Sequence, residues 1–250
     1  MDADTIIKTV NLTKKYKRYE AVSNLNLEVK EGEIFGFLGP NGAGKTTTLL
    51  MLLGLSQPTS GSAEIFGLDP IRKAKEVKRV VGYLPENVGF YGELDAVQSL
   101  EYVASLNGIQ KSKIAEKTEE LLELVGITQD AHKKIGAFSR GMKQRLGIAE
   151  VLIKEPSILF LDELTLGLDP EGALRLIDLI HSLNRDRKIT VLLCSHNLHQ
   201  VQRISNRVGI MLDGKMIAEG SIESLAKEKF GVGEKEYSLE EIYLTYFQEV

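Results

Sequence analysis

Gly39-Pro40-Asn41-Gly42-Ala43-Gly44-Lys45-Thr46 is the stretch of sequence that decides the fold. It fits the pattern G-x-x-x-x-G-K-[ST] of a phosphate-binding loop. The apolar segment 34–38 before it predicts a buried strand, and the segment 47–53 after it predicts a helix. In that context the glycines let successive backbone N–H groups point at phosphate oxygens, and the helix N-terminus adds partial positive charge. A Gly-rich turn that matches by chance is the alternative, and the strand–loop–helix order disfavours it.

The loop predicts a site for ATP and Mg²⁺. We expect Lys45 to reach the β- and γ-phosphates and the Thr46 hydroxyl to ligate the metal. The predicted nucleotide-binding residues of this segment are Gly39, Pro40, Asn41, Gly42, Ala43, Gly44, Lys45, Thr46 and Thr47.

A carboxylate that organises Mg²⁺ and a group that orients water are the other parts such a site needs. Ile158-Leu159-Phe160-Leu161-Asp162-Glu163 supplies both, because its four apolar residues predict a buried strand that ends in two acids. The ends of parallel strands are where ligands bind, so Asp162 is predicted to hold the metal and Glu163 to act as general base. A solvent-facing acidic pair is the alternative, and the phosphate loop disfavours it.

Composition limits the classes of protein that the chain can belong to. The 250 residues carry a net charge of −4, so the chain is not expected to bind nucleic acid. Its one cysteine, Cys194, lies in the apolar run 190–194 and predicts a buried thiol in a reducing compartment. No stretch reaches the ~18 apolar residues of a membrane span, and the N-terminus lacks a signal peptide's apolar core. Any membrane role is therefore expected to come through a partner.

The pattern along the chain is that of an α/β protein. Residues 1–85 and 156–220 are predicted to form an ATP-binding core that includes a β subdomain, in which segment 6–12 pairs with the alternating segment 24–29. A helical insert is expected over 86–155.

Three local signals complete the pattern. Asp169 with Pro170 predicts the start of a helix, and Asp213-Gly214 predicts the turn of a hairpin. A helical tail is expected over 221–250, with a capping box at Ser238 and Glu241. We favour packing of its apolar face on the core over a docking surface for a second copy or a partner.

The motifs in this order resemble the ATP-binding cassette (ABC) proteins, specifically the nucleotide-binding subunits of ABC transporters, over residues 5–220. Tyr16 stands where the family stacks an aromatic ring on adenine, and Phe138–Leu146 resembles the family signature, usually written LSGGQ. Gly167-Leu168-Asp169 resembles the loop that communicates across the dimer, and Ser195-His196 matches the switch histidine. The alternatives are an ordinary surface tyrosine at 16 and, for His196, a metal ligand paired with His199, which lacks a supporting ligand cluster.

The resemblance implies a P-loop NTPase fold of the ABC ATPase type, with an antiparallel β subdomain and an inserted helical subdomain. It implies an ATPase that powers a separate integral membrane permease and lies in the cytoplasm, on the inner face of the membrane. Two copies, a homodimer by preference, would close head to tail so that Ser139 and Gly141 of one contact the ATP held by the other. His196 would contact the γ-phosphate, and Glu86 would stand at the metal-linked position that is usually Gln.

Several residues depart from the family pattern. Besides Glu86, these are Arg140 and Met142 in the signature and Leu164 and Leu166 after the acidic pair. A basic residue at 140 is common in the branch whose permeases export drugs, lipids or polysaccharides. The sequence offers no physical reason for the two leucines.

Two short segments, 82–91 and 194–198, are similar to the ATPase that serves copper-site maturation of nitrous-oxide reductase. That resemblance implies an extracytoplasmic partner as well as a permease. A soluble ABC ATPase that acts in cofactor or metal-cluster assembly without a permease is the alternative function.

Overall fold

A computed structural model describes residues 5–231 and 237–248 of the chain. The first four residues of the predicted core, and residues 232–236 and 249–250 of the predicted tail, lie outside the described residues. The strands are β1 (Thr5–Tyr16), β2 (Tyr19–Lys30), β3 (Ile34–Leu38), β4 (Ser60–Ile65), β5 (Val81–Leu84), β6 (Ile158–Asp162), β7 (Thr190–Ser195), β8 (Arg207–Leu212) and β9 (Lys215–Gly220). The helices are α1 (Lys45–Leu52), α2 (Ala74–Val80), α3 (Ala96–Leu106), α4 (Lys111–Leu124), α5 (Arg140–Leu152), α6 (Pro170–Arg187), α7 (Leu198–Ile204), α8 (Ile222–Phe230) and α9 (Leu239–Gln248).

The described strands form two sheets. The larger has six strands in the order β5-β6-β7-β3-β8-β9, parallel except for the antiparallel pair β8-β9. Its central strands β3, β6 and β7 are buried at every residue, which explains their continuous apolar sequence. The smaller sheet is antiparallel, with three strands in the order β2-β1-β4. The predicted α/β class, the pairing of 6–12 with 24–29 and the hairpin at Asp213-Gly214 are thus confirmed.

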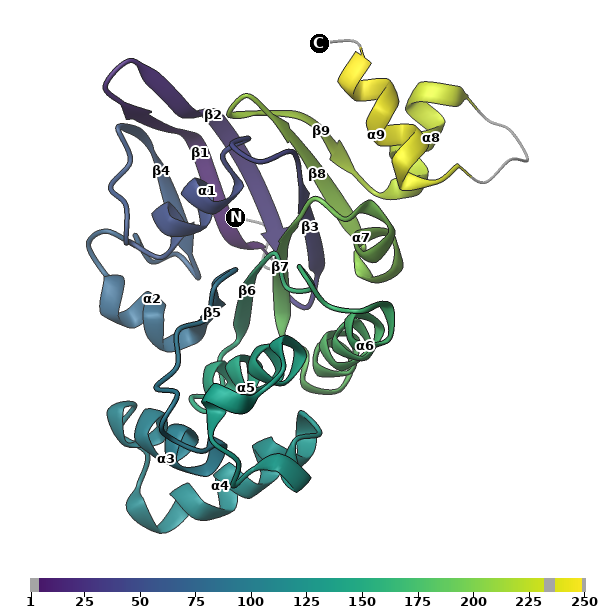
Figure 1. Cartoon of the computed structure of the whole chain (residues 1–250). Helices are drawn as coiled ribbons and strands as arrows, with labels where there is room; N and C mark the ends of the chain where they lie inside the picture. Colours follow the sequence, from purple (N-terminus) through teal and green to yellow (C-terminus); the bar gives the residue numbers. More distant parts are fainter. Residues whose placement is uncertain (1–4, 232–236, 249–250) are drawn as a thin grey trace.

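The helices cover the larger sheet and extend beyond it. α3, α4 and α5 contact one another, and α3 and α4 gather at the end of the molecule away from α8 and α9 (Figure 1). The side chain of Asp95 caps α3 in a capping box with Gln98. α6 begins where the sequence predicts, because the Asp169 side chain accepts from the Gly172 N–H and Pro170 stands in the first turn.

The C-terminal helices pack back on the core, as the favoured interpretation predicts. The capping box at the start of α9 is present, since Glu241 N donates to Ser238 Oγ at 3.2 Å and Ser238 N donates to Glu241 Oε2 at 2.9 Å. Leu239, Ile242 and Tyr246 are buried, and α9 contacts α7 and α8. The opposite side of α9 leaves Leu244 exposed.

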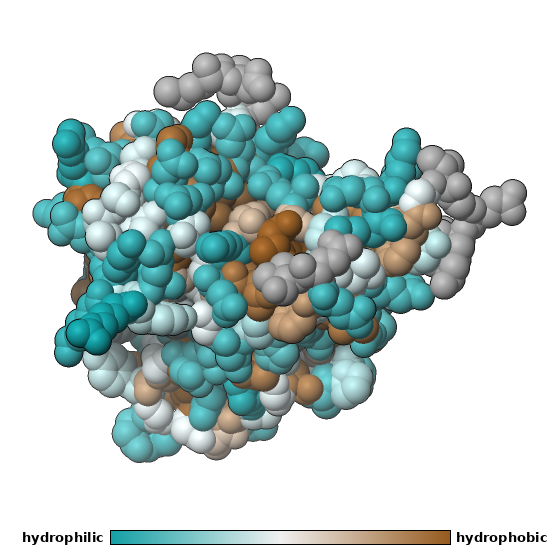
Figure 2. Space-filling model, turned by 90° about the horizontal axis from the view of Figure 1, so that it is seen from above, coloured by the Kyte–Doolittle hydropathy of each residue, from teal (hydrophilic) through white to brown (hydrophobic). Residues whose placement is uncertain are grey.

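The surface seen from above Figure 1 is largely hydrophilic, with small scattered hydrophobic areas (Figure 2). None of the helices in the described ranges has the length and apolarity that crossing a bilayer requires. Cys194 is buried, as predicted, and burial raises the pKa of its thiol well above the ordinary range.

Gly36 in β3 is a point where α7 comes close to the sheet. A Cβ there would stand 2.4 Å from Val201 Cγ1 and 2.8 Å from Ser205 Oγ. We expect Gly36→Ala to lower the free energy of unfolding by about 1–3 kcal/mol, because the helix must shift to admit the methyl group. Urea unfolding measures this. Gly89→Ala is the control, since a Cβ at Gly89 has no neighbour within 4 Å, and equal stability of the two variants would contradict the close packing.

Candidate nucleotide-binding site

The order of the central strands brings the predicted motifs to one edge of the sheet. β3, β6 and β7 are parallel neighbours in the order β6-β7-β3, so their carboxyl ends lie side by side. The phosphate loop follows β3, Asp162 ends β6 and Ser195 ends β7. Such an edge is the usual ligand-binding position of an α/β sheet.

The phosphate loop has the backbone conformation that anion binding requires. Gly42 and Gly44 have φ values of 85° and 105°, in the left-handed region that favours glycine. Gly44 caps α1 directly, and no acidic residue stands in the first turn of that helix. The amides at the start of α1 are therefore presented to a ligand without a competing carboxylate on the same turn.

Lys45 is held inside the loop. Its Nζ donates to the carbonyl oxygens of Gly39 at 2.6 Å and Pro40 at 3.1 Å, and lies 3.8 Å from Glu163 Oε1. The side chain is only 6% exposed. An ammonium so buried and oriented is preorganised to meet a polyanion.

Asp162 combines a hydrogen bond to the loop with an unpartnered oxygen. Thr46 Oγ1 donates to Asp162 Oδ2 at 2.8 Å, whereas Asp162 Oδ1 is buried and has no hydrogen-bond partner among the described residues. Burial raises the pKa of the Asp162 carboxyl, and the charge of Glu163 raises it further, while the hydrogen bond from Thr46 opposes the shift.

These two residues fit a magnesium ion. A buried carboxylate oxygen without a partner is costly unless a cation or donor completes it, and hard oxygen ligands suit Mg²⁺. No group of three or more His, Cys, Asp or Glu side chains in the described part of the chain could hold a metal alone. Phosphate oxygens and water would therefore have to complete the coordination, which is how Mg²⁺ is usually bound beside nucleotides.

Glu163 contacts both Lys45 of the loop and His196, the predicted switch histidine. Its Oε2 is 2.9 Å from His196 Nδ1, and its side chain is 8% exposed. The Glu163 N–H donates to the carbonyl of Cys194 at 2.9 Å, so β7 fixes the backbone of Glu163 as well. The predicted base and the predicted γ-phosphate contact are thus brought together from separate strands.

A pocket of about 200 Å³ surrounds these groups. Residues 41–47 of the loop and both acids line it, together with Tyr16 and Glu86, as the sequence predicts. The predicted residues Gly39, Pro40 and His196 are not among the described residues that line it. Tyr19 lines it too, and sequence reasoning missed it; its hydroxyl donates to the carbonyl of Gly42 at 3.0 Å. The signal was present in the sequence, because Tyr19 stands three residues after Tyr16 across a two-residue turn. The lining residues are Tyr16, Tyr19, Ala21, Asn41, Gly42, Ala43, Gly44, Lys45, Thr46, Thr47, Glu86, Asp162 and Glu163.

The signature lies apart from this pocket. Ser139 caps α5, its Oγ accepting from the Met142 N–H at 3.2 Å, and it is exposed. Neither Ser139 nor Gly141 is among the described residues that line the pocket. The structure therefore does not bring the predicted signature contacts to the nucleotide of the same chain.

One departure from the family pattern now has a physical reason. Leu164 is 3% exposed and belongs to the main hydrophobic core, so an apolar side chain is required after Glu163. Nothing in the structure explains Leu166.

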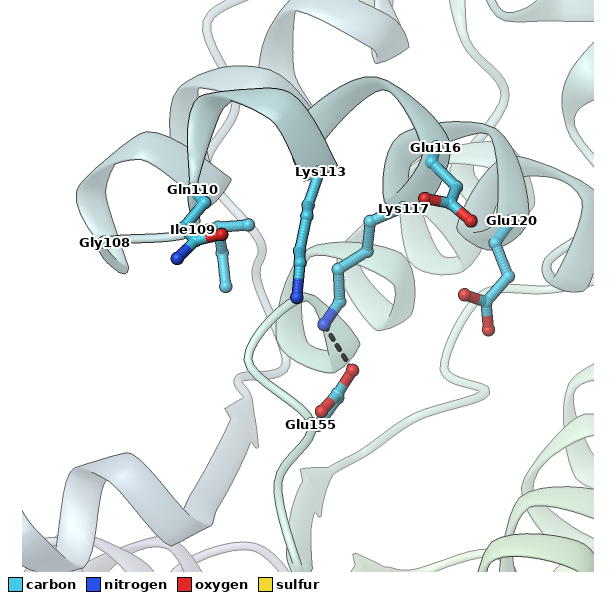
Figure 3. Close-up of a pocket in the computed structure, with 8 residues that line it drawn as sticks. All are labelled: Gly108, Ile109, Gln110, Lys113, Glu116, Lys117, Glu120 and Glu155. Carbon is cyan, nitrogen blue, oxygen red and sulfur yellow. Dashed lines mark hydrogen bonds and ion pairs between the residues drawn. The ribbon is translucent and has the colours of Figure 1, made fainter.

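A second cavity, of about 420 Å³, lies beside α4 (Figure 3). Lys117 from α4 pairs there with Glu155 at 2.5 Å, and Lys113 points into the same space. The cavity is lined by Gly108, Ile109, Gln110, Lys113, Glu116, Lys117, Glu120 and Glu155. It contains none of the motif residues, although it is larger than the pocket at the phosphate loop, so volume alone would misplace the site.

Comparisons with known proteins agree with this geometry. A family model described as "ABC transporter" matches residues 22–166. The chain is 47% identical over 223 residues to the bacitracin transport ATP-binding protein BcrA of Bacillus licheniformis, covering 89% of this chain and 72% of that protein. A structure of an ATP-binding subunit of an ABC transporter superposes with a TM-score of 0.86 at 26% identity, covering 97% of this chain and all of that one. The dimeric cassette MJ0796, bound to ADP and phosphate, superposes with a TM-score of 0.76 at 26% identity, covering 86% of this chain and 98% of that one.

We expect Asp162→Asn to stabilise the nucleotide-free protein at pH 7 and to abolish the Mg²⁺ dependence of nucleotide binding. The wild-type carboxyl has a raised pKa in the folded state, so the folded state loses stability as the pH rises from the ordinary aspartate range through that raised pKa. Asparagine removes this loss and still offers Thr46 an acceptor. The difference in stability should therefore shrink as the pH falls from 7 to about 4.

Urea unfolding at several pH values and calorimetry with ADP, with and without Mg²⁺, measure the two effects. Asp178→Asn is the control, because Asp178 is exposed and pairs only at the surface with Arg203, so its effect should stay within about 0.5 kcal/mol. A destabilised Asp162→Asn variant at pH 7 would contradict the cost that we assign to the buried carboxylate.

Proposed function

We propose which residues at this edge of the sheet carry each part of ATP hydrolysis, given that the chain belongs to the ABC transporter family of ATP-binding subunits. The observation that carries the proposal is the cluster of Lys45, Asp162 and Glu163, buried around one small pocket at the phosphate loop. The residue roles below extend the family's ATPase activity to individual side chains of this chain.

Binding and orientation of ATP fall to the loop and the hairpin tip. The amides at the start of α1 and the ammonium of Lys45 bind the phosphates. Tyr16, 48% exposed at the end of β1, offers its ring to adenine, and the Lys14 Nζ lies 4.8 Å from the centre of that ring. Tyr19 braces the loop through its hydrogen bond to Gly42.

Hydrolysis requires a water molecule aligned with the γ-phosphate. Glu163 accepts a proton from that water. His196, whose Nδ1 lies 2.9 Å from the Glu163 carboxylate, orients this carboxylate and donates a hydrogen bond to the γ-phosphate. Thr46 and Asp162 would hold Mg²⁺, with Glu86 at the rim of the pocket, and the bound ion would neutralise charge on the phosphate oxygens.

A second copy completes the site. The exposed Ser139 and the half-buried Gly141 stand at the start of α5 and do not line the described pocket of their own chain. In a head-to-tail homodimer they reach the γ-phosphate bound by the partner, and each charge-assisted contact contributes about 1.5–3 kcal/mol. Loss of the γ-phosphate removes these contacts, so hydrolysis opens the dimer.

The permease is proposed to dock beside the helical segment. A groove of about 370 Å³ lies between β5 and α3, and the exposed Leu55 and the half-buried Val103 are among its apolar lining side chains. Tyr91 lies close to Glu86 in the sequence and is 66% exposed. A permease segment that contacts Tyr91 would therefore be coupled to the metal-linked position at Glu86. We propose the same division of the chain as the sequence predicts, into the core (1–85 and 156–220), the helical segment (86–155) and the tail (221–250). A docked permease would hold the chain peripherally on the inner face of the membrane.

The transported cargo is proposed to be a peptide antibiotic of the bacitracin type. The support is the 47% identity to the bacitracin transport ATP-binding protein, together with the basic residue at position 140. Copper maturation and an extracytoplasmic partner stay predictions from two short segments of sequence.

We expect Glu163→Gln to keep ATP binding, to lower kcat by about 10²–10⁴-fold and to accumulate as an ATP-bound dimer. The amide cannot accept the proton of water, whereas the phosphate contacts remain. Phosphate release and gel filtration with ATP and Mg²⁺ measure the two outcomes. Full hydrolysis by this variant would refute the assignment of the base.

Lys45→Ala is the matched control for that experiment. Its affinity for ATP should fall about 10–100-fold, because a charge-assisted contact to the phosphates is lost. It should therefore form no ATP-dependent dimer, and an unchanged affinity by calorimetry would remove the phosphate-loop assignment.

The cargo proposal is tested with the chain and the permease that co-purifies with it, reconstituted in vesicles. Bacitracin is expected to stimulate ATP hydrolysis several-fold, since a cargo that binds the closing transporter favours the hydrolytic state. Glu163→Gln vesicles correct for background phosphate release. A wild-type complex that hydrolyses ATP at the same rate with and without bacitracin would reject this cargo and leave the ATPase assignment intact.

A further inference from the structure

The loop 163–169 joins the acidic end of β6 to α6 and begins with Glu163. Its first half is fixed to the core, because Leu164 is buried and Thr165 Oγ1 donates to Gln200 Oε1 of α7. The backbone continues as a tight turn, in which Leu166 N donates to the Glu163 carbonyl at 3.1 Å and Leu168 N donates to the Thr165 carbonyl at 3.2 Å. The second half reaches the signature helix.

Gly167 is the point of contact between this loop and the signature. Its φ is +71°, and a Cβ at this position would lie 2.5 Å from Nη1 and 2.9 Å from Cζ of Arg140. The guanidinium of Arg140 therefore occupies the space that any side chain at 167 would need. Leu168 supports the same contact, since its Cδ2 lies 3.7 Å from the Cβ position of Gly141.

The guanidinium is not engaged elsewhere by a carboxylate. Among the ion pairs of residues 5–231 and 237–248, none includes Arg140. A planar guanidinium can lie flat against a backbone that lacks a side chain, whereas a lysine ammonium cannot cover it in this way. Arginine at 140 and glycine at 167 are thus complementary in shape.

We propose that Arg140 is a positioning residue that couples the signature to the loop carrying the general base. Arg140 is the first residue of α5, directly between Ser139 and Gly141, so any movement of these two residues also moves the guanidinium on Gly167. When the signature closes on the partner's nucleotide, Arg140 moves with it and shifts Gly167. This shift repositions the loop 163–169, and with it Glu163, in the same chain. The inference rests on the proposed function for its consequence in catalysis, but the contact itself is a property of the nucleotide-free chain.

Amide hydrogen exchange of the full chain without nucleotide tests the contact directly. In Arg140→Ala the amides of Leu166 and Leu168 should exchange about tenfold faster, because the turn loses the group that covers it. Arg185→Ala is the control, since Arg185 is an exposed arginine of α6 that pairs with its neighbour Asp186. Unchanged exchange in Arg140→Ala overturns the proposal, whether or not the wild-type protein hydrolyses ATP.

A double-mutant cycle tests the coupling to catalysis. Arg140→Ala should lower kcat about tenfold with unchanged ADP affinity, because the base is misplaced while the pocket is intact. Gly167→Ala should have a similar effect, and the double variant should be no slower than the slower single variant. Gly67→Ala is the matched control, because Gly67 has a φ of +72° and open space around its Cβ position.

Three results of the cycle would overturn the proposal. Multiplicative losses in the double variant would show that the two residues act independently. An unchanged kcat in Arg140→Ala would show that the contact has no catalytic consequence. A raised KM for ATP at full kcat would identify Arg140 as a phosphate-binding residue of the dimer instead. A wild-type chain without ATPase activity would refute the proposed function, while the exchange result would stand on its own.

Discussion

The interaction on which the rest depends is the buried charge cluster of Lys45, Asp162 and Glu163. Charged groups with so little exposure are costly unless they are paired, and here the pairing is incomplete. Within residues 5–231 and 237–248, one carboxylate oxygen of Asp162 has no hydrogen-bond partner, and Lys45 contacts two loop carbonyls and the more distant Glu163. A triphosphate with Mg²⁺ supplies a cation for Asp162 and anionic oxygens for Lys45. Ligand binding therefore lowers the electrostatic cost of these buried charges.

The sheet sustains this cluster because neighbouring parallel strands carry the lysine, the acids and the adjacent His196 to one edge. β3 delivers the loop, β6 the two acids and β7 the histidine, and adjacent pairing keeps their ends level. α7 packs closely on β3 at Gly36, and α9 contacts α7 in turn. The C-terminal helices thus bear on the element that follows His196, although they lie far from the phosphate loop in the sequence.

The proposed site draws on a second copy of the chain. Ser139 of the signature caps α5 and does not line the pocket, while the guanidinium of Arg140 lies beside Gly167 in the loop that begins with Glu163. A residue that departs from the family pattern is therefore a structural link in this chain, and the buried Leu164 has a comparable role at the start of the same loop. The resemblance to the family identifies Arg140 and Leu164 as departures from its pattern. Only the packing contacts in the structure give a physical reason for these two residues.

The sequence by itself determined the strands around the phosphate loop, the acidic strand end, the helix starting at Asp169 and the hairpin at Asp213-Gly214. These features depend on local rules, namely unbroken apolar runs, capping and turn chemistry, which act over a few residues. Only the tertiary structure decided that Tyr19 lines the pocket, that Asp162 keeps an unpartnered oxygen, and that Arg140 lies on Gly167. Those facts depend on contacts between segments distant in the chain, where side-chain packing rather than pattern sets the geometry.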